Sequence, residues 1–281
     1  MKYLILGSEG QIGKSLCDFL VKHGNEVFRY DIQNDDSQDL RTINKNKNNK
    51  KNFLSKLEQS DFVYFLAWDV GGSKYLEAKE GSFDFLNNNV LIMNNVFESL
   101  YKIQKPFVFT SSQMAYMSDS VYGNTKLLGE KYTKAANGIC VKLWNVYGEH
   151  DSDGEKSHVI TDFVKQGIQK KQIDMLTDGN ESRQLLHVDD CCAALYRLSL
   201  LNKSDINNKE LHITSFQWIK IKDVAMEVAK QLGCNFCAAK KKDRVQNDKR
   251  IEPDKFILDF WEPQISIEDG IKRIIKKHLD M

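Results

Sequence analysis

The amino-acid sequence predicts an α/β fold, in which a doubly wound parallel sheet is followed by a smaller mixed α/β C-terminal domain. Short apolar runs alternate with amphipathic stretches along the first half of the chain, which is the pattern of repeated strand–helix units. The runs are apolar throughout, as expected of parallel strands that helices cover on both faces. From Ser204 onward the segments become shorter and less regular, and they predict the smaller domain.

Strands and helices of the first half are expected to follow one another in turn. Apolar runs predict strands at KYLILG (2–7), EVFRYD (26–31), DFVYFLAW (61–68) and PFVFTSS (106–112). Apolar residues at helical spacing predict a helix over 12–20, and further helices are expected at 89–101 and 122–135. The polar run KNKNNKKN at 45–52 is expected to be a solvated loop, because it is too polar to pack.

The second half of the chain predicts fewer regular elements. The segment KLWNVYG (142–148) predicts a strand and a turn, and LLHVDDCCAALYRLSLL (185–201) predicts a turn followed by a buried helix with an acidic start. We therefore place a first domain at 1–143, with return segments near 187–203, and a discontinuous second domain mainly at 144–281.

Composition argues against several classes of partner. The chain of 281 residues has a net charge of +1, so its charge balance gives no support to a nucleic-acid or membrane partner. No run of about 18 apolar residues occurs, and the N-terminus enters a strand rather than a signal peptide. We therefore expect a cytoplasmic protein with six reduced cysteines. Cys234 and Cys237 lack a second pair to complete a zinc site, so no metal is expected.

Three glycines lie between the first strand and the first helix, in the segment GSEGQIG. Gly7 would allow a tight turn, Gly10 would let the backbone approach a pyrophosphate, and Gly13 would let the helix pack closely on the sheet. The free N–H groups at the helix start would bind phosphate. The glycines alone also fit an ordinary strand–helix turn, but the strand before them and the amphipathic helix after them favour a Rossmann-type dinucleotide site in the first domain.

Asp31 ends the second predicted strand, 18 residues after Gly13. A carboxylate at this place can accept hydrogen bonds from the hydroxyls of the adenosine ribose. The same negative charge would repel a 2′-phosphate, so the sequence favours NAD over NADP as the cofactor.

Context distinguishes three Tyr-x-x-x-Lys pairs in the sequence. The pairs are Tyr75/Lys79, Tyr101/Lys105 and Tyr122/Lys126. Tyr122 lies ten residues after Ser112, which closes an apolar strand, and residues at the carboxyl ends of parallel strands face the ligand crevice. Tyr75 and Tyr101 follow no such strand, so the context selects Tyr122.

Oxidation of an alcohol requires a group that takes the hydroxyl proton as hydride leaves the carbon. A free tyrosine, with a pKa of about 10, is a poor base at neutral pH. Lys126 lies one helical turn from Tyr122 on the same face, and its positive charge would favour the phenolate. Ser112 would hold the substrate oxygen beside Tyr122. The alternative is an exposed helical pair without chemistry.

The segments GSEGQIG and YGNTKLLGE together resemble the extended short-chain dehydrogenase/reductase family, which acts largely on nucleotide sugars. The resemblance covers nearly the whole chain and includes DFVYFLAW, VFTSSQMAY, KLWNVYG and RQLLHVDD. It implies that Ser112, Tyr122 and Lys126 are catalytic, and that Lys126 also hydrogen-bonds the nicotinamide ribose. The cofactor-binding residues that it implies are Gly7, Gly10, Gln11, Ile12, Gly13, Asp31, Ala67, Trp68 and Lys126.

A narrower likeness is to GDP-fucose synthase and its relatives. It lies in VGGS at 70–73 and in NVYGEHD…SHVI at 145–160, and it favours a GDP-sugar as the substrate of the second domain. His158 is similar to a histidine of that branch, and Arg183 to a family arginine that binds the nucleotide diphosphate. The substrate-binding residues that the resemblance implies are Asn145, His158, Arg183 and Arg250.

Departures from the family pattern narrow the expected reaction. Dehydratases of the family carry an Asp-Glu pair directly after the position of Ser112, whereas this chain has Gln113 and Met114, which do not titrate. Met114 also stands where GDP-fucose synthase has the cysteine used for epimerisation. We therefore expect neither dehydration nor epimerisation by proton abstraction.

Hydride transfer remains as the predicted reaction, and the family resemblance implies that it takes place at C4 of a nucleotide sugar. We expect a GDP-sugar 4-dehydrogenase, acting on a GDP-mannose-type hexose or heptose in surface-polysaccharide biosynthesis. A 4-epimerase or a 4-keto reductase would use the same residues, and the motifs do not separate the three. A regulatory protein that only binds NAD would be expected to lack the Ser/Tyr/Lys set, which is complete here. The resemblance also implies a homodimer formed through the helices at 89–101 and 122–135.

Overall fold

A six-stranded parallel sheet forms the centre of the molecule in the structure, a computed structural model that describes residues 1–151, 154–207, 209–243 and 251–280. The strands are β1 (Lys2–Leu6), β2 (Glu26–Tyr30), β3 (Phe62–Phe65), β4 (Phe107–Ser112), β5 (Ile139–Leu143) and β9 (His212–Ile213). Their order is β2-β1-β3-β4-β5-β9, and neighbouring strands are parallel. The order reverses between β1 and β3, which is where open α/β sheets bind ligands.

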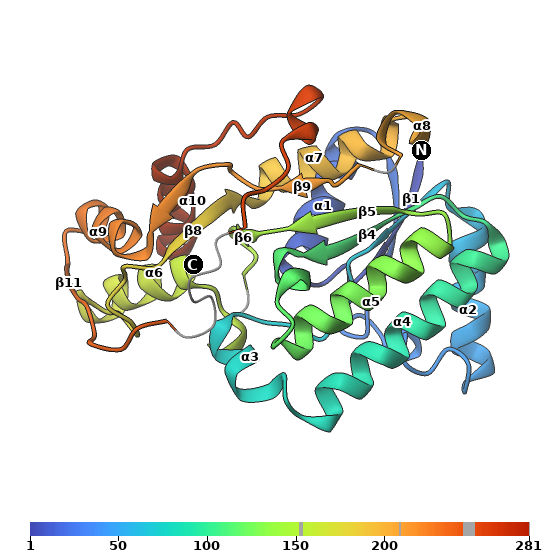
Figure 1. Cartoon of the computed structure of the whole chain (residues 1–281), viewed down its shortest axis with the longest axis horizontal. Helices are drawn as coiled ribbons and strands as arrows, with labels where there is room; N and C mark the ends of the chain where they lie inside the picture. The colour runs from blue at the N-terminus through green and yellow to red at the C-terminus, as the bar shows by residue number, and fades with distance from the viewer. Residues whose placement is uncertain (152–153, 208, 244–250, 281) are drawn as a thin grey trace.

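Helices cover both faces of this sheet, as the predicted doubly wound fold requires (Figure 1). The helices on one face are α1 (Gln11–Lys22) and α7 (Val188–Leu200), and those on the other are α2 (Lys47–Gln59), α4 (Phe83–Ile103) and α5 (Val121–Ala135). Strand β1 shows why its sequence is apolar throughout: Tyr3 and Ile5 pack in the core of the first face, whereas Leu4 and Leu6 pack in that of the second.

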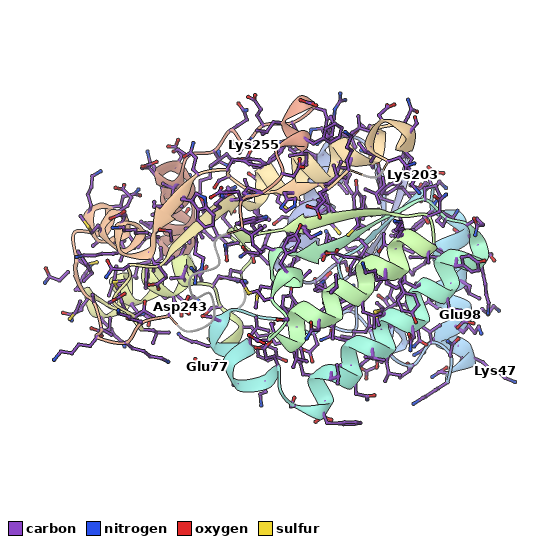
Figure 2. The ribbon with its side chains drawn as sticks, in the orientation of Figure 1. Lys47, Glu77, Glu98, Lys203, Asp243 and Lys255 are labelled. Atoms are coloured by element: carbon purple, nitrogen blue, oxygen red, sulfur yellow. The ribbon has the colours of Figure 1, made fainter. Side chains whose placement is uncertain are left out.

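The polar run at 45–52, expected to be a loop, instead contains the start of α2 (Lys47–Gln59). The side chain of Asn46 accepts hydrogen bonds from two backbone N–H groups of the first turn, at 2.9 and 3.3 Å, and so caps the helix. Phe53 and Leu57 are fully buried and hold α2 against the sheet, while Lys47 lies at the outer edge of the molecule (Figure 2). The prediction of a loop was wrong because the residues that anchor this helix follow the polar run.

The second half of the chain forms two small sheets and packs helices around a core of its own. One sheet has the order β10-β8-β6 and the other pairs β11 with β7. The elements are β6 (Asn145–Tyr147), α6 (Val159–Lys170), β7 (Gln172–Asp174), β8 (Ser182–His187), β10 (Trp218–Lys220), α9 (Ile221–Leu232), β11 (Asn235–Cys237) and α10 (Ile267–Leu279). The short helix α3 (Ser73–Lys79) follows β3, and α8 (Lys203–Ile206) belongs by sequence to the second half but packs on the central sheet through Ile206. Within the described ranges, no helix is long and apolar enough to cross a membrane.

A buried carboxylate connects the two halves. Asp190, near the start of α7, is almost fully buried, and its Oδ2 accepts hydrogen bonds from the backbone N–H groups of Gln264 and Ile265, at 3.0 and 2.8 Å. These two residues lead into α10. The segment before the last helix is therefore attached to a helix that covers the central sheet.

Candidate active site

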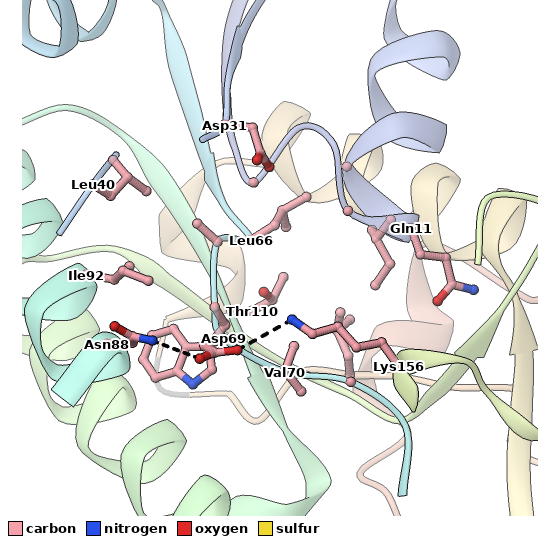
Figure 3. A pocket seen from close by; sticks show the side chains of 18 of the residues that line it. Gln11, Asp31, Leu40, Leu66, Asp69, Val70, Asn88, Ile92, Thr110 and Lys156 are labelled. Atoms are coloured by element: carbon pink, nitrogen blue, oxygen red, sulfur yellow. Dashed lines mark hydrogen bonds and ion pairs between the residues drawn. The ribbon is translucent and has the colours of Figure 1, made fainter. Parts of the chain in front are cut away.

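A cavity of about 480 Å³ opens at the carboxyl ends of β1, β3 and β4 (Figure 3). Its walls come from the glycine turn after β1, the segment after β3, the end of β4, helix α5 and part of the second half. All the residues predicted to be catalytic or to bind the cofactor line it. They are Gly7, Gly10, Gln11, Ile12, Gly13, Asp31, Ala67, Trp68, Ser112, Tyr122 and Lys126. Residues that are up to about 120 positions apart in sequence thus meet at one place.

The glycine turn is shaped for close approach of a backbone. Gly7 has φ of +87°, and a Cβ on it would lie 2.7 Å from the backbone nitrogen of Ala67. A Cβ on Gly13 would lie 2.0 Å from the Gly7 carbonyl oxygen, so the start of α1 packs directly on the turn. A Cβ on Gly10 would meet nothing closer than 3.5 Å. Packing within the described protein therefore requires glycine at positions 7 and 13, and leaves space at position 10 beside the cavity.

Asp31 follows β2 directly and is held by the backbone of two loops. Its Oδ2 accepts a hydrogen bond from the N–H of Glu9 at 3.0 Å, and its Oδ1 accepts one from the N–H of Gln33 at 2.9 Å. Each carboxylate oxygen has a further lone pair, so Asp31 can still accept hydrogen bonds from a ligand.

The wall on the Asp31 side of the cavity contains residues that sequence reasoning missed. They are Asp39, Leu40, Arg41, Asn88 and Ile92. Arg41 donates two hydrogen bonds to the carboxylate of Asp39, at 2.9 and 3.0 Å, and one to the side chain of Asn88, at 3.1 Å. The available signal was the short segment Asp39-Leu40-Arg41, which puts an apolar residue between opposite charges in an otherwise polar stretch.

Tyr122 lies in the first turn of α5, next to the end of β4. Burial raises the pKa of its phenol to about 12, although a hydrogen bond with the Ser112 side chain acts in the opposite direction. Ser112 is itself fixed, because its Oγ accepts a hydrogen bond from the N–H of Met114 at 3.1 Å. Tyr122 is therefore protonated at neutral pH in this state and can donate a proton.

Lys126 lies one turn further along α5 and is 3% exposed. Burial lowers the pKa of its ammonium from 10.5 to about 7, and the Cys140 thiol opposes this shift. The ammonium donates to the carbonyl oxygen of Thr110 at 2.8 Å and lies 4.0 Å from the centre of the Trp68 ring. Its distance to the centre of the Tyr122 ring is 5.8 Å. The expected lowering of the Tyr122 pKa by Lys126 is thus not the dominant effect in this arrangement.

The start of α5 is positioned by a carboxylate from the end of α3. Glu80 Oε2 accepts hydrogen bonds from the hydroxyl of Ser120 at 2.9 Å and from the backbone N–H of Tyr122 at 3.1 Å. The hydroxyl of Ser120 in turn accepts from the N–H of Gly123 at 3.0 Å. A negative charge at a helix N-terminus is stabilising, and here it also fixes the backbone of Tyr122.

The other two Tyr-x-x-x-Lys pairs have different surroundings. The Tyr75 hydroxyl donates to Asp69 Oδ1 at 2.6 Å, and Tyr101 is exposed near the end of α4. Neither tyrosine is among the described residues that line the cavity, whereas Tyr122 is.

Of the described residues that were predicted to bind substrate, His158 lines the cavity, whereas Asn145 and Arg183 do not. His158 lines the cavity, and its Nδ1 lies 2.6 Å from Oδ1 of Asp151. Burial opposes ionisation of Asp151, but the hydrogen bond and charge of His158 hold the pKa of this carboxyl below its usual range. The cavity lining found among the described residues does not include Asn145, which donates to the Gln184 carbonyl oxygen at 3.3 Å.

Arg183 also lies away from the cavity lining that the described ranges provide. Its guanidinium is paired with Asp243 and donates to the Ser182 carbonyl oxygen at 2.9 Å. Asp243 lies where the second half approaches α3, near Glu77 (Figure 2). Arg250 lies outside the described residues.

The sequence matches a known family over most of its length. A model of the NAD dependent epimerase/dehydratase family matches residues 3–213, which include the glycine turn, Ser112, Tyr122 and Lys126. The chain belongs to this family. The extended short-chain dehydrogenase/reductase resemblance expected from the motifs is thereby confirmed, and the protein is an enzyme that uses NAD.

Individual members of the NAD-dependent epimerase/dehydratase family are similar over nearly the full length. A UDP-glucuronate 4-epimerase of Thermodesulfobacterium geofontis is 26% identical over 97% of this chain and 94% of its own. The fold is also that of a UDP-glucose 4-epimerase of Thermotoga maritima, with a TM-score of 0.81, 17% identity and coverage of 100% and 99%. A GDP-D-glycero-L-gluco-heptose synthase of Campylobacter jejuni aligns with a TM-score of 0.79, 20% identity and coverage of 99% and 98%.

The cavity of this family member fits the cofactor NAD in three ways. The space beside Gly10, at the N-terminus of α1, is suited to a diphosphate, because the first N–H groups of a helix have no partner within it. Asp31 is suited to ribose hydroxyls and unsuited to a 2′-phosphate. Two buried donors that line the cavity, Nε2 of Gln11 and Nε1 of Trp68, have no partner among the described residues. Buried donors of this kind are normally hydrogen-bonded, so a bound polar group is expected here.

Proposed function

We propose that the protein transfers hydride at C4 of a nucleotide sugar, as a GDP-sugar 4-dehydrogenase in the biosynthesis of a surface polysaccharide. The observation that carries this proposal is that Ser112, Tyr122 and Lys126 line one cavity together with the glycine turn. The hydroxyl of Ser112 at the end of β4 and that of Tyr122 in α5 would thus lie beside a dinucleotide bound at this turn.

Each of these side chains has a separate task in the proposed reaction. NAD, when bound, accepts the hydride. The hydroxyl of Ser112 orients the substrate oxygen toward Tyr122, with which it already shares a hydrogen bond. The phenol of Tyr122 exchanges a proton with that oxygen, a contribution typically worth about 10²- to 10⁴-fold in rate. Lys126 holds the ribose and supplies positive charge, which favours the deprotonated phenol when it lies close.

The residues after Ser112 support hydride transfer without elimination. Gln113 and Met114 begin the turn that follows β4, and Met114 packs with Tyr122. Neither side chain can remove a proton from carbon. His158 also lines the cavity, with its Nδ1 next to Asp151, and we assign it to contact with the sugar.

A 4-epimerase is the second candidate. It would use the same residues and differ only in letting the keto sugar turn over before hydride returns. The similarity to the UDP-glucuronate 4-epimerase over nearly the full length of both chains favours it. The nucleobase is likewise proposed as guanine from the sequence likeness, with uracil as the alternative that the test below includes.

We also propose that the enzyme is a homodimer formed through α4 and α5. Apolar side chains on these neighbouring helices are each at least 38% exposed, although Tyr132 also stacks on Phe97 of α4. They are Phe83, Leu86, Leu127, Leu128 and Tyr132. A second copy would bury these side chains, as expected where apolar side chains gather on an exposed surface.

Product analysis separates these candidates. The protein is incubated with GDP- and UDP-sugars, with and without added NAD, and products are analysed by mass and by sugar stereochemistry. Loss of two hydrogens from the sugar, with NADH formed, supports the dehydrogenase. Unchanged mass with inverted C4 supports the epimerase. Absence of any product with every sugar would contradict the proposal.

Replacing Tyr122 by Phe tests the site itself. Tyr122→Phe keeps the ring and removes the proton, so turnover should fall by about a hundredfold or more. The dissociation constant for NADH, measured by fluorescence, should stay within about threefold of the wild-type value, because the ring still fills its place. Near-normal turnover would remove Tyr122 from the proposed chemistry.

A further inference from the structure

Lys156 enters the cavity from the second half of the molecule, and nothing above assigns it a task. It ends the short 3-10 helix Gly154–Lys156, and its side chain is 45% exposed. Its ammonium lies 3.5 Å from Oδ1 of Asp69, which also lines the cavity (Figure 3), and 4.5 Å from the centre of the Tyr75 ring.

The main chain of Lys156 is fixed against the segment that follows β3. The N–H of Gly72 donates to the Lys156 carbonyl oxygen at 3.1 Å. A Cβ on Gly72 would lie 2.1 Å from the Ser157 carbonyl oxygen, and one on Gly71 would lie 3.0 Å from Cγ of Lys156. The two segments therefore pack without space between them, and the end of the Lys156 side chain is the part that can move.

Asp69 keeps its hydrogen bonds if Lys156 leaves it. Its Oδ1 accepts from the Tyr75 hydroxyl at 2.6 Å, and its Oδ2 accepts from the Asn88 side chain at 3.0 Å (Figure 3). The backbone N–H of Asp69 donates to Oδ1 of Asn89 at 2.8 Å. The ion pair with Lys156 is the longest of these contacts, so breaking it leaves no buried charge without partners.

Two other cations that line the cavity are bound more closely. Arg41 has two hydrogen bonds to Asp39, at 2.9 and 3.0 Å, and Lys126 has one to the Thr110 carbonyl oxygen at 2.8 Å. Of these three described cations, Lys156 has the weakest hold on its present partner. It is the one best able to turn toward an anion that enters the cavity.

We propose that Lys156 binds a diphosphate in this cavity, exchanging the carboxylate of Asp69 for a phosphate oxygen. A lysine ammonium is a compact charge that suits phosphate, and the N–H groups at the start of α1 face the same cavity. Two ligands carry such a diphosphate: the dinucleotide, in its pyrophosphate, and a nucleotide sugar. Binding of the nucleotide sugar rests on the proposed function.

Binding measurements on the full chain test this assignment. Lys156→Met removes the charge, Lys156→Arg keeps it, and Lys74→Met is the matched control. Lys74 pairs with Asp162 at 2.5 Å and is absent from the cavity lining in the described ranges. NADH is titrated by fluorescence, and GDP and UDP are titrated by calorimetry into protein loaded with NAD. Guanosine and uridine, which lack the diphosphate, are titrated in parallel.

We expect Lys156→Met to bind NADH, or GDP and UDP, about tenfold more weakly than the wild type does. This difference in affinity should shrink at high salt. Lys156→Arg should recover most of the affinity, and Lys74→Met should behave as the wild type. A loss confined to NADH assigns the cofactor pyrophosphate, and a loss confined to GDP and UDP assigns the substrate. Equal affinities of Lys156→Met and wild type for all these ligands would overturn the proposal. A wild-type protein that binds them but converts no sugar would instead refute the proposed function alone.

Discussion

The ammonium group of Lys126 is buried among groups that compensate its charge only in part. The carbonyl oxygen of Thr110 accepts a hydrogen bond from it, and the centres of the Trp68 and Phe109 rings lie 4.0 and 5.0 Å away. Aromatic faces attract a cation weakly compared with the loss of hydration on burial. A lysine in a cavity whose pKa is strongly lowered is more typical of a functional site than of a stabilising contact.

Replacing Lys126 by Met should therefore stabilise the protein and abolish its activity. Turnover should fall by about a hundredfold or more, and the Tm should rise at pH 6, because a desolvated charge is removed. The unfolded chain keeps the lysine proton up to about pH 10.5, whereas the folded chain releases it near pH 7. The wild type thus gains stability as the pH rises from 7 toward 10.5, and the advantage of the variant shrinks.

Thermal unfolding of both proteins between pH 6 and about pH 9 measures this difference, and titration of other groups cancels in the comparison. If Lys126→Met has no higher Tm than the wild type at pH 6, or if its excess in Tm grows with pH, burial of the charged ammonium does not destabilise the folded protein.

The part of the site that the sequence could predict lies on short continuous segments. Ser112, Tyr122 and Lys126 share one strand end and one helix, so strand position and helical spacing were enough to bring them together. Lys156 and Asp69 were not predictable in this way, because their contact joins segments far apart in the chain. Such contacts depend on how the two halves pack, which periodicity does not describe.

At the scale of elements, we expect two glycines of the turn between β1 and α1 to have different roles: Gly13 is needed for packing, and Gly10 for ligand binding. Gly13→Ala should destabilise the protein by about 1–3 kcal/mol, because its methyl group would collide with the Gly7 carbonyl. Gly10→Ala should change the unfolding free energy by less than about 0.5 kcal/mol, since its φ of −70° suits alanine.

The alanine methyl in Gly10→Ala would, however, occupy the space proposed for the diphosphate. This variant should therefore bind NADH about tenfold more weakly than the wild type does. Urea unfolding and NADH titration of both variants measure the two effects. Wild-type affinity for NADH in Gly10→Ala would show that the dinucleotide does not approach the turn at this residue.

The helices show where local sequence patterns succeed and fail. Helix α5 was expected at 122–135 and spans Val121–Ala135, because its cap and apolar face are local features. Helix α4 was expected from residue 89 but begins at Phe83, after the cap residue Ser82. In its first turn Phe85 is the single buried apolar side chain, so the start of the helix carries little periodic signal. The same applies to α2, whose polar start is stabilised by the buried residues that follow.

At the scale of the whole molecule, the proposed dimer can be tested with one added charge. Leu128 is 44% exposed on α5, and Leu128→Glu would place a carboxylate in the apolar surface shared with α4. We expect this variant to be monomeric by light scattering, because an unpaired buried charge is strongly unfavourable at an interface. Met226→Glu is the matched control, since Met226 is 47% exposed on α9. A wild-type monomer would contradict the dimer directly.

The attachment of Asp190 to the segment at 264–265 makes the end of the chain a support for the half that holds the glycine turn. Loss of this segment would remove both hydrogen bonds that Asp190 accepts from it and, together with α10, the buried side chains of Ile271, Ile274 and Ile275 in the core of the second half. A version of the protein shortened before residue 264 should therefore be less stable than the full chain, even though every residue proposed to bind NAD would still be present.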